Sequence, residues 1–577
     1  MPITRRDNAV VVVLVLSLVV LGGVIAMPAP VHDAAATPEP TPEVTLPPPV
    51  TYREGVVGVP ATVMPVVART RSERTLVGLI FSGLVRLGPD NTYEPDLAES
   101  WTTDAKGRTW TFKIRDDATW QDGEPVTAED VVFTVEALKD PAASGAMAGA
   151  WADVTATAID PKTVELTVAT PIAGFLAATT QPLLPAHLLS DVPLADLAKS
   201  PFAKAPVGTG PYSLTELDDT HALLTPVALM DHPADVPFGP TPSVDSLGTP
   251  APTQTPALAV PYLERIELDF FEDDAAAAEA FSSGAVDGVA GLPPAISAAL
   301  ASDPSVTSVK YPTTTLATVL LNLRSSHPEL RDARVRKALL GAIDRQAIVN
   351  GALGGEGLRA DALVPPGSWA FDAKAAAPVA FDAKAATKLL TDAGWKKKDG
   401  KWTAKGGKAP YAMQLLTVPA SANPRLAAVA TAIAKAWTDF GIGVQVVETP
   451  AADLATKLRG GDFTAAALDI TMGLEPDLYP LLASSQVRGS GTNLSGYQDP
   501  ALDALLETAR KPGTPDGRMT AWRELLTGLA ARQPLLPIAW HSEDVLQRGV
   551  EGPTPRLIAG PGDRFWDVLA WRLAADR

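Results

Sequence analysis

Histidines, carboxylates and glycine-rich turns are the groups in this chain that could carry chemistry. The six histidines are His32, His187, His221, His232, His327 and His541. None stands at metal-ligand spacing from another histidine or an acidic partner, so the pattern predicts no metal site. Neither a G-x-S-x-G nucleophile elbow nor a G-x-x-x-x-G-K-[ST] phosphate loop occurs. Gly208-Thr-Gly210 runs into Pro211-Tyr212 instead of a helix, which argues against a dinucleotide-binding turn.

Paired carboxylates are the remaining route to catalysis, because two of them can hydrolyse a glycosidic bond. The chain has 66 aspartates and glutamates, so neighbouring carboxylates arise by chance and most are solvated surface charges. A hydrolase is therefore only the third hypothesis for this chain. We expect no enzyme activity and no cofactor.

The segments that would position a site alternate between strand and helix patterns. Helices are predicted where a capping residue precedes an apolar face, as after Thr127, Asp332 and Asn423. Glycines end two of the predicted helices, at Gly284 and Gly441. Strand-like alternation of apolar and polar residues occurs at 110–114, 164–168, 266–270 and 444–448. A mixed α/β architecture follows.

Composition limits the environment and the partners. The 577 residues are 46% hydrophobic and 20% charged, a globular balance. The net charge of −18 repels phosphate backbones and anionic lipid, so nucleic-acid binding is disfavoured. The chain has no cysteine, which excludes disulfides, thiolate metal sites and a lipid-attachment cysteine.

The N-terminal residues predict export. Arg5-Arg6 precede an apolar run over 9–27, close to the length of about 20 residues that a membrane helix needs. Positive charge stays on the cytoplasmic side, so the body is expected outside. Residues 1–27 are either an uncleaved anchor or a signal peptide. The proline-rich segment 28–50 is expected to be an extended linker, and a second proline-rich stretch, 231–261, a surface insertion.

Sequence motifs recur in one order along the body. They include Glu94-Pro-Asp-Leu-Ala-Glu-Ser-Trp101, Trp120-Gln-Asp-Gly-Glu-Pro-Val-Thr-Ala-Glu-Asp-Val-Val-Phe133, Pro206-Val-Gly-Thr-Gly-Pro-Tyr212, Arg334-Val-Arg-Lys-Ala-Leu339 and Tyr497-Gln-Asp-Pro-Ala-Leu-Asp503. Their order from 51 to 540 resembles the family 5 extracellular solute-binding proteins, which include the oligopeptide-, dipeptide- and nickel-binding components of ABC importers.

The resemblance implies a two-lobed periplasmic-binding-protein-like fold of the class II type. An extra subdomain would extend the first lobe, and one N-terminal transmembrane or signal helix would precede the body. The expected boundaries are 51–90 for the start of the first lobe, 91–205 for the extra subdomain, 206–315 for the rest of the first lobe, 316–536 for the second lobe and 537–577 for a C-terminal return.

The resemblance also implies a set of ligand-binding residues between the lobes. They are Phe81, Ser82, Gly83, Gly291, Asn322, Asp469, Met472 and Trp540. For each of them packing or a turn is an equally good explanation. Peptide-binding relatives place a tryptophan and, three residues on, an aspartate that pairs with the amino terminus of the peptide. Here Asp469 and Met472 occupy these positions, which puts peptide specificity in doubt.

The expected function is capture of a small solute (a peptide, a sugar or a metal chelate) for delivery to ABC permease subunits and their ATPase. The protein is expected to be monomeric and extracytoplasmic, anchored to the cell membrane through its N-terminal helix, or periplasmic or secreted if a signal is cleaved. The alternative is a membrane-tethered sensor or adhesion module on the same fold, without a role in transport.

Overall fold

The computed structural model describes residues 50–88, 92–104, 106–144, 148–227, 263–487, 489 and 491–574. The predicted N-terminal helix, the linker up to residue 49 and the 231–261 insertion lie outside these residues. Among the described residues, no helix has both the length and the apolar character needed to span a bilayer. We call 51–315 and 537–574 the first lobe and 316–536 the second, using the boundaries expected from the sequence.

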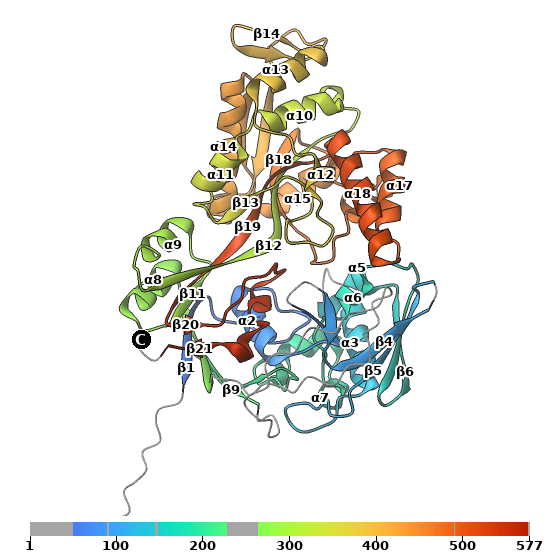
Figure 1. Cartoon of the computed structure of the whole chain (residues 1–577), viewed down its shortest axis with the longest axis vertical. Helices are drawn as coiled ribbons and strands as arrows, with labels where there is room; N and C mark the ends of the chain where they lie inside the picture. Colours follow the sequence, from blue (N-terminus) through green and yellow to red (C-terminus); the bar gives the residue numbers. More distant parts are fainter. Residues whose placement is uncertain are drawn as a thin grey trace, which may run out of the picture. The chain divides into compact units, whose positions relative to one another are not determined.

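Two long antiparallel strands connect the lobes (Figure 1). They are β12 (Val306–Leu321) and β19 (Leu536–Arg548), paired from Val306 opposite Arg548 to Val319 opposite Leu536. The register shifts between Pro312 and Leu316. The strands of the first lobe join at one end of this pair, through β11 beside β19, and those of the second lobe at the other end, through β18 beside β12.

The resulting sheet has the strand order β17-β16-β18-β12-β19-β11-β1-β10-β9-β8, with β13 beside β19. Its first-lobe strands are β1 (Thr51–Val57), β8 (Tyr212–Leu217), β9 (His221–Pro226), β10 (Arg265–Phe271) and β11 (Gly288–Ala290). Its second-lobe strands are β13 (Gly357–Arg359), β16 (Ala412–Thr417), β17 (Gly443–Glu448) and β18 (Ala465–Thr471).

A separate four-stranded sheet belongs to the first lobe. Its order is β4 (Ala98–Thr103), β5 (Thr109–Ile114), β7 (Thr163–Val168) and β6 (Val154–Asp160). Trp101, Trp110 and Phe112 of this sheet are buried in the core of the first lobe. The helices of the first lobe are α2 (Arg71–Ile80), α3 (Ala128–Lys139), α4 (Pro141–Ser144), α5 (Ala148–Trp151), α6 (Phe175–Ala178), α7 (Ala186–Leu189), α8 (Asp274–Ser283) and α9 (Pro294–Leu300). A short hairpin pairs β2 (Val85–Leu87) with β3 (Tyr93–Pro95), and β20 (Val550–Glu551) pairs antiparallel with β21 (Arg572–Leu573) near the C-terminus.

The second lobe has apolar layers on both faces of its sheet. On β18, Ala465 and Ala467 belong to the layer beneath α14, whereas Ala466 belongs to the layer beneath α15, as the alternation of a strand requires. The helices are α10 (Ala333–Gly341), α11 (Arg345–Gly351), α12 (Ala373–Ala376), α13 (Ala383–Asp392), α14 (Pro424–Phe440), α15 (Ala451–Gly460), α16 (Tyr479–Leu482), α17 (Pro500–Ala509) and α18 (Pro515–Arg532). A small hairpin pairs β14 (Lys396–Lys398) with β15 (Lys401–Thr403).

The elements expected from the sequence motifs are confirmed. Thr127 caps α3 with a capping box, and Asp332 and Asn423 cap α10 and α14 through their side chains. Gly284 and Gly441 end α8 and α14 with φ of 76° and 107°. Such left-handed conformations favour glycine, which has no Cβ to clash.

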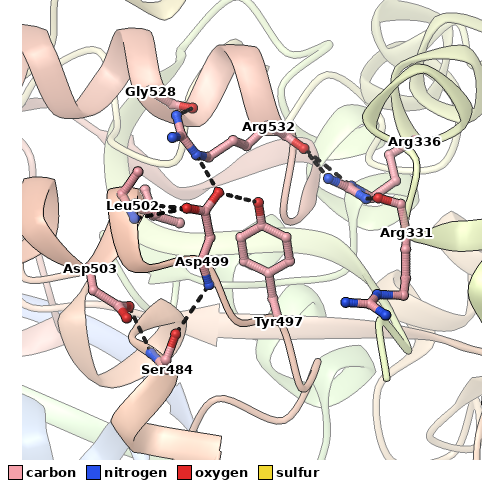
Figure 2. Close-up of polar contacts among 10 residues, drawn as sticks. Arg331, Arg336, Ser484, Tyr497, Asp499, Leu502, Asp503, Gly528 and Arg532 are labelled. Atoms are coloured by element: carbon pink, nitrogen blue, oxygen red, sulfur yellow. Dashed lines mark hydrogen bonds and ion pairs between the residues drawn. The ribbon is translucent and has the colours of Figure 1, made fainter. Parts of the chain in front are cut away.

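Two sequence motifs of the second lobe meet at a buried arginine (Figure 2). Arg336 of α10 is 1% exposed and donates to the backbone oxygens of Leu330, Arg331 and Gln533 at 2.9, 2.7 and 2.8 Å, and to that of Arg532. Its guanidinium lies 5.5 Å from the centre of the Tyr497 ring.

The Tyr497–Asp503 motif completes this junction. Asp499 accepts hydrogen bonds from the Tyr497 hydroxyl at 3.0 Å and from Arg532 Nε at 2.7 Å. The segment after β18 is thereby fastened to the end of α18 and to α10. Both motifs hold the fold through the contacts that Figure 2 shows.

We expect Arg336→Lys to lower the free energy of unfolding by about 3 kcal/mol, because a single ammonium cannot satisfy carbonyls spread around a planar guanidinium. Urea unfolding followed by circular dichroism measures this loss. Arg334→Lys is the matched control on the same helix, since Arg334 is half-exposed. Equal stability of the two variants would contradict the structural role of Arg336.

Candidate functional site

The carboxyl edge of the second-lobe sheet carries a polar group of three residues. β16 and β18 are parallel, so both end at this edge, where open α/β sheets commonly bind ligands. Asp469 lies near the end of β18, and Asn423, the N-cap of α14, donates from Nδ2 to Asp469 Oδ2 at 2.9 Å. His541 of β19 places Nε2 2.8 Å from Asp469 Oδ1.

The register explains how two strands that are not neighbours share this contact. Ala317 of β12 pairs with Asp469 on one side and with Ala539 on the other. His541 stands two residues beyond Ala539, on the same face of the sheet. The methyl group of Ala317 leaves room above β12 for the aspartate and the imidazole to meet.

Asp469 is held ionised by this arrangement. Burial alone would raise its pKa, but hydrogen bonds from His541 and Asn423, together with nearby Arg425, lower it below its ordinary value. Both carboxylate oxygens therefore already accept a hydrogen bond within the protein.

Arg425 connects this edge to the first lobe. Its Nη2 donates to the backbone oxygen of Leu292, in the first lobe, at 2.7 Å and to Glu356 Oε2 at 2.6 Å. Glu356 is 3% exposed, and burial raises its pKa although Arg425 opposes the shift. Its Oε1 has no hydrogen-bond partner among the described residues. Arg425 thus joins the two lobes through two buried partners, Leu292 of the first lobe and Glu356 of the second.

A second contact between the lobes lies at the ends of α6 and α17. The Ala173 amide donates to the Arg510 oxygen at 2.9 Å. A Cβ on Gly174 would lie 2.5 Å from Cγ of Glu475, so glycine permits this close approach. Glu475 accepts from Trp369 Nε1 at 3.1 Å and pairs with Arg518, and burial raises its pKa despite that pairing.

A cavity of about 470 Å³ lies in the second lobe beside the end of β18. Its lining is Leu320, Val418, Ala451, Leu454, Ala455, Leu458, Arg459, Leu468, Asp469, Ile470, Thr471, Leu481, Thr492 and Leu494. A concave, mainly aliphatic site with a few polar groups is what small-molecule binding needs. Arg459 is exposed and makes no ion pair or hydrogen bond within the part of the chain that the structure describes.

The structure brings only some of the expected ligand residues to this region. Asp469 lines the cavity, and Met472, half-buried, follows β18 with its amide 3.1 Å from the Thr314 oxygen. Gly291 precedes Leu292, the partner of Arg425, and has φ of 72°. A Cβ on Gly291 would lie 2.3 Å from a guanidinium nitrogen of Arg71.

The other expected second-lobe residues are occupied by structural contacts. Asn322 is fully buried, and its amide donates to the oxygens of Gly461 and Phe463 at 2.9 and 2.8 Å. Trp540 is 1% exposed within the apolar layer beneath α15. These contacts fasten the end of β12 to the start of β18 and fill the core.

The expected first-lobe residues pack around the end of α2. Phe81 is 5% exposed, with its ring 6.1 Å from that of Phe202. The Ser82 amide donates to Thr209 Oγ1 at 3.0 Å. A Cβ on Gly83 would lie 2.7 Å from the Thr180 oxygen, so this position requires glycine. No hydrogen bond joins these three to the Asp469 group within the described residues.

Sequence reasoning missed His541, Arg425, Glu356 and Arg459 as parts of this region. Asn423 was recognised only as a helix cap. A polar N-cap residue in the loop after a strand indicates a position at the carboxyl edge of a sheet. Asn423 fits this pattern, so its place at the edge could have been predicted. His541 could not be identified from the sequence as the partner of Asp469, because the two residues lie 72 positions apart.

Comparison with known proteins agrees with the fold and the ordered motifs. The family model described as "Bacterial extracellular solute-binding proteins, family 5 Middle" matches residues 92–490. The chain belongs to this family.

Two curated relatives and one solved structure illustrate the likeness. Protein XP55 of Streptomyces lividans is 29% identical over 83% of this chain and 81% of its own. A probable D,D-dipeptide-binding periplasmic protein of Escherichia coli is 27% identical over 78% of this chain and 80% of its own. The crystal structure of NikZ from Campylobacter jejuni, in complex with Ni(L-His), is 23% identical, covers 91% of this chain and 99% of its own, and has a TM-score of 0.67. This structural match confirms the mixed α/β, two-lobed fold.

We expect Asp469→Asn to lower the free energy of unfolding by about 2 kcal/mol at pH 7, because a charged, hydrogen-bonded carboxylate is lost. The folded-state pKa is depressed, so the carboxylate stabilises the protein above its unfolded pKa of about 3.9. That stabilisation disappears as the pH falls through the lower folded-state value.

The difference in the free energy of unfolding between wild type and Asp469→Asn should therefore shrink below pH 4, which is about the unfolded-state pKa. Urea titrations at several pH values measure this difference. Asp439→Asn is the control, since Asp439 is largely exposed beside Lys435. A difference that stays constant down to pH 3, about one unit below that pKa, would show that Asp469 is not ionised through its partners.

Proposed function

We propose that this protein captures a small solute outside the cytoplasm and delivers it to the permease of an ABC importer. The observation that carries the proposal is the aliphatic cavity between β18 and α15 in the second lobe. Asp469 contributes to its lining, while its carboxylate is directed to the α14 face of the sheet, where Asn423 and His541 bind it. A protein that must release its cargo needs such a site without catalytic groups. The membership of the chain in a solute-binding family supports the same conclusion.

The cavity favours a solute with an aliphatic part. Ten of its fourteen lining residues are leucine, isoleucine, valine or alanine, and its charged residues are Asp469 and Arg459. We propose that the unpartnered guanidinium of Arg459 receives an anionic group of the solute. A peptide, a sugar derivative and a metal chelate with carboxylate groups all satisfy this chemistry.

Peptide binding of the kind that the resemblance describes has a specific obstacle here. The position of the anchoring aspartate is Met472, which offers no charge. Asp469 is not a free substitute, because both of its oxygens are already engaged by His541 and Asn423. An amino terminus would have to displace one of these partners.

The ligand set carried over from the family stays a proposal, with unequal support. Asp469, Met472 and Gly291 lie at the edge where the lobes meet. The packing of Phe81, Ser82, Gly83, Asn322 and Trp540 is accounted for by their own contacts and adds no support for ligand binding. We further propose that residues 1–27 keep the protein at the cell membrane or direct its export, and that the body acts as a monomer.

The experiment that tests capture starts with a native mass spectrum of purified residues 51–577, because a bound solute appears as added mass. Thermal shift against a panel of peptides, sugars and metal chelates then identifies the class. At a ligand concentration of about 100 times Kd, the stabilisation should be about 2.7 kcal/mol. No added mass and no stabilisation across the panel would contradict capture.

We expect Ala455→Trp to weaken binding of the identified solute at least about tenfold, because the indole would fill the cavity that Ala455 lines. Ala452→Trp is the matched control, since Ala452 is exposed on the same helix and does not line the cavity. Isothermal titration calorimetry measures both. Equal affinity of the two variants would place the solute elsewhere.

A further inference from the structure

A strongly basic segment stands out from this acidic protein. Residues 383–408, from α13 through the β14–β15 hairpin, contain eight lysines and two aspartates, a net charge of +6 against −18 for the whole chain. Six of the lysines lie within thirteen residues, at Lys396, Lys397, Lys398, Lys401, Lys405 and Lys408. All six are exposed, and β14 lies beyond α13 in the second lobe (Figure 1).

The hairpin is held rigidly on α14 by its inner face. Lys397 and Trp402 are cross-strand partners, and both donate to the Phe440 oxygen at the end of α14, at 3.0 and 3.1 Å. Trp402 is 1% exposed. The turn at Asp399-Gly400 has φ of 50° and 77°, as the tight type I′ hairpin requires.

The outer face presents lysines that have no compensating partners. Lys398 and Lys401 lie directly opposite each other, and Lys396 is on the same face. Like charges at this cross-strand spacing destabilise a hairpin. Within the described residues these three lysines form no hydrogen bond or ion pair. A cluster of like charges that makes no direct ion pair is typical of a surface kept for function.

We propose that this lysine face binds the anionic headgroups of a lipid bilayer. Protein interfaces are depleted in lysine and enriched in arginine, tyrosine and tryptophan. Segment 383–408 has no arginine, and its two tryptophans, Trp395 and Trp402, are buried. Clustered, flexible point charges without an apolar anchor match the diffuse attraction of an anionic membrane surface.

The overall negative charge does not prevent this contact. Electrostatic interactions between exposed charges decay over a Debye length of about 10 Å at 0.1 M salt. A bilayer that approaches the hairpin therefore meets the local charge of +6 before the acidic remainder of the body. Contact at this face would orient the second lobe relative to the membrane, independently of the ligand cavity and of any N-terminal anchor.

The test compares the full-length protein with K396Q/K398Q/K401Q on vesicles of phosphatidylcholine alone and of phosphatidylcholine with about 30 mol% phosphatidylglycerol. Any membrane insertion of the N-terminal segment would add equally to the vesicle binding of wild type and variants. Binding to the neutral vesicles measures this contribution. At about fivefold per lysine, the variant should lose about a hundredfold of the partition onto anionic vesicles at low salt. High salt should abolish the wild-type preference.

The control is K106Q/K199Q/K374Q, which removes three exposed lysines outside the hairpin and should keep wild-type binding. Melting temperatures verify folding, and K396Q/K398Q/K401Q should melt no lower than wild type because the Lys398–Lys401 repulsion is removed. Equal losses in both variants, or no preference for phosphatidylglycerol, would overturn the proposal. Crosslinking of the hairpin lysines to a co-expressed permease, without vesicle binding, would assign the face to a protein and overturn it as well.

Discussion

The antiparallel pairing of β12 with β19 is the constraint on which the rest of the structure depends. Twelve of the thirteen β19 residues are buried, although the strand contains His541, Ser542, Glu543, Asp544 and Gln547. Buried polar groups need partners, and these find them on both lobes: His541 meets Asp469, Glu543 meets Arg71, and Asp544 accepts from Ser308 at 2.6 Å. The crossing strand therefore fixes the register of the sheet and also determines which side chains of each lobe meet it.

A buried chain of alternating charges fastens the first-lobe end of this strand. Glu54 of β1 and Arg564 of the C-terminal return are both fully buried and paired, and the Tyr52 hydroxyl donates to Glu54 at 2.7 Å. Arg564 also lies 3.8 Å from Glu543, which pairs with Arg71 of α2. Removing one member would leave an uncompensated buried charge, which costs about 3–5 kcal/mol. The N-terminal strand, the C-terminal return and α2 are thus linked to β19 by one network.

Local rules explain why the elements could be predicted from the sequence and the site could not. Capping residues and end glycines act over a few positions, so α3, α8, α10 and α14 could be located. The reason for the Gly-Thr-Gly-Pro-Tyr motif is tertiary: a Cβ on Gly208 would lie 1.9 Å from the Ile80 oxygen, and Gln121 donates to the oxygen of Tyr212 at 2.9 Å. Similarly, the contact between Asp469 and His541 depends on Ala317, and no spacing rule connects residues on three strands. Resemblance supplied the class of protein, but packing decides which of its residues face a solute.

The position of the cavity constrains how a solute could bring the lobes together. Every residue that lines it belongs to the second lobe, between Leu320 and Leu494. A ligand shifts a conformational equilibrium only by its difference in affinity for the two states. A solute confined to this cavity would contact the same residues whether the lobes were together or apart, so it would provide little drive for closure. Closure must then come from a part of the solute that reaches the edge near Gly291 and Leu292, where Arg425 already joins the lobes. The first lobe would then contact a part of the solute that extends beyond the cavity, distinct from the aliphatic part and from the anionic group that we propose Arg459 receives.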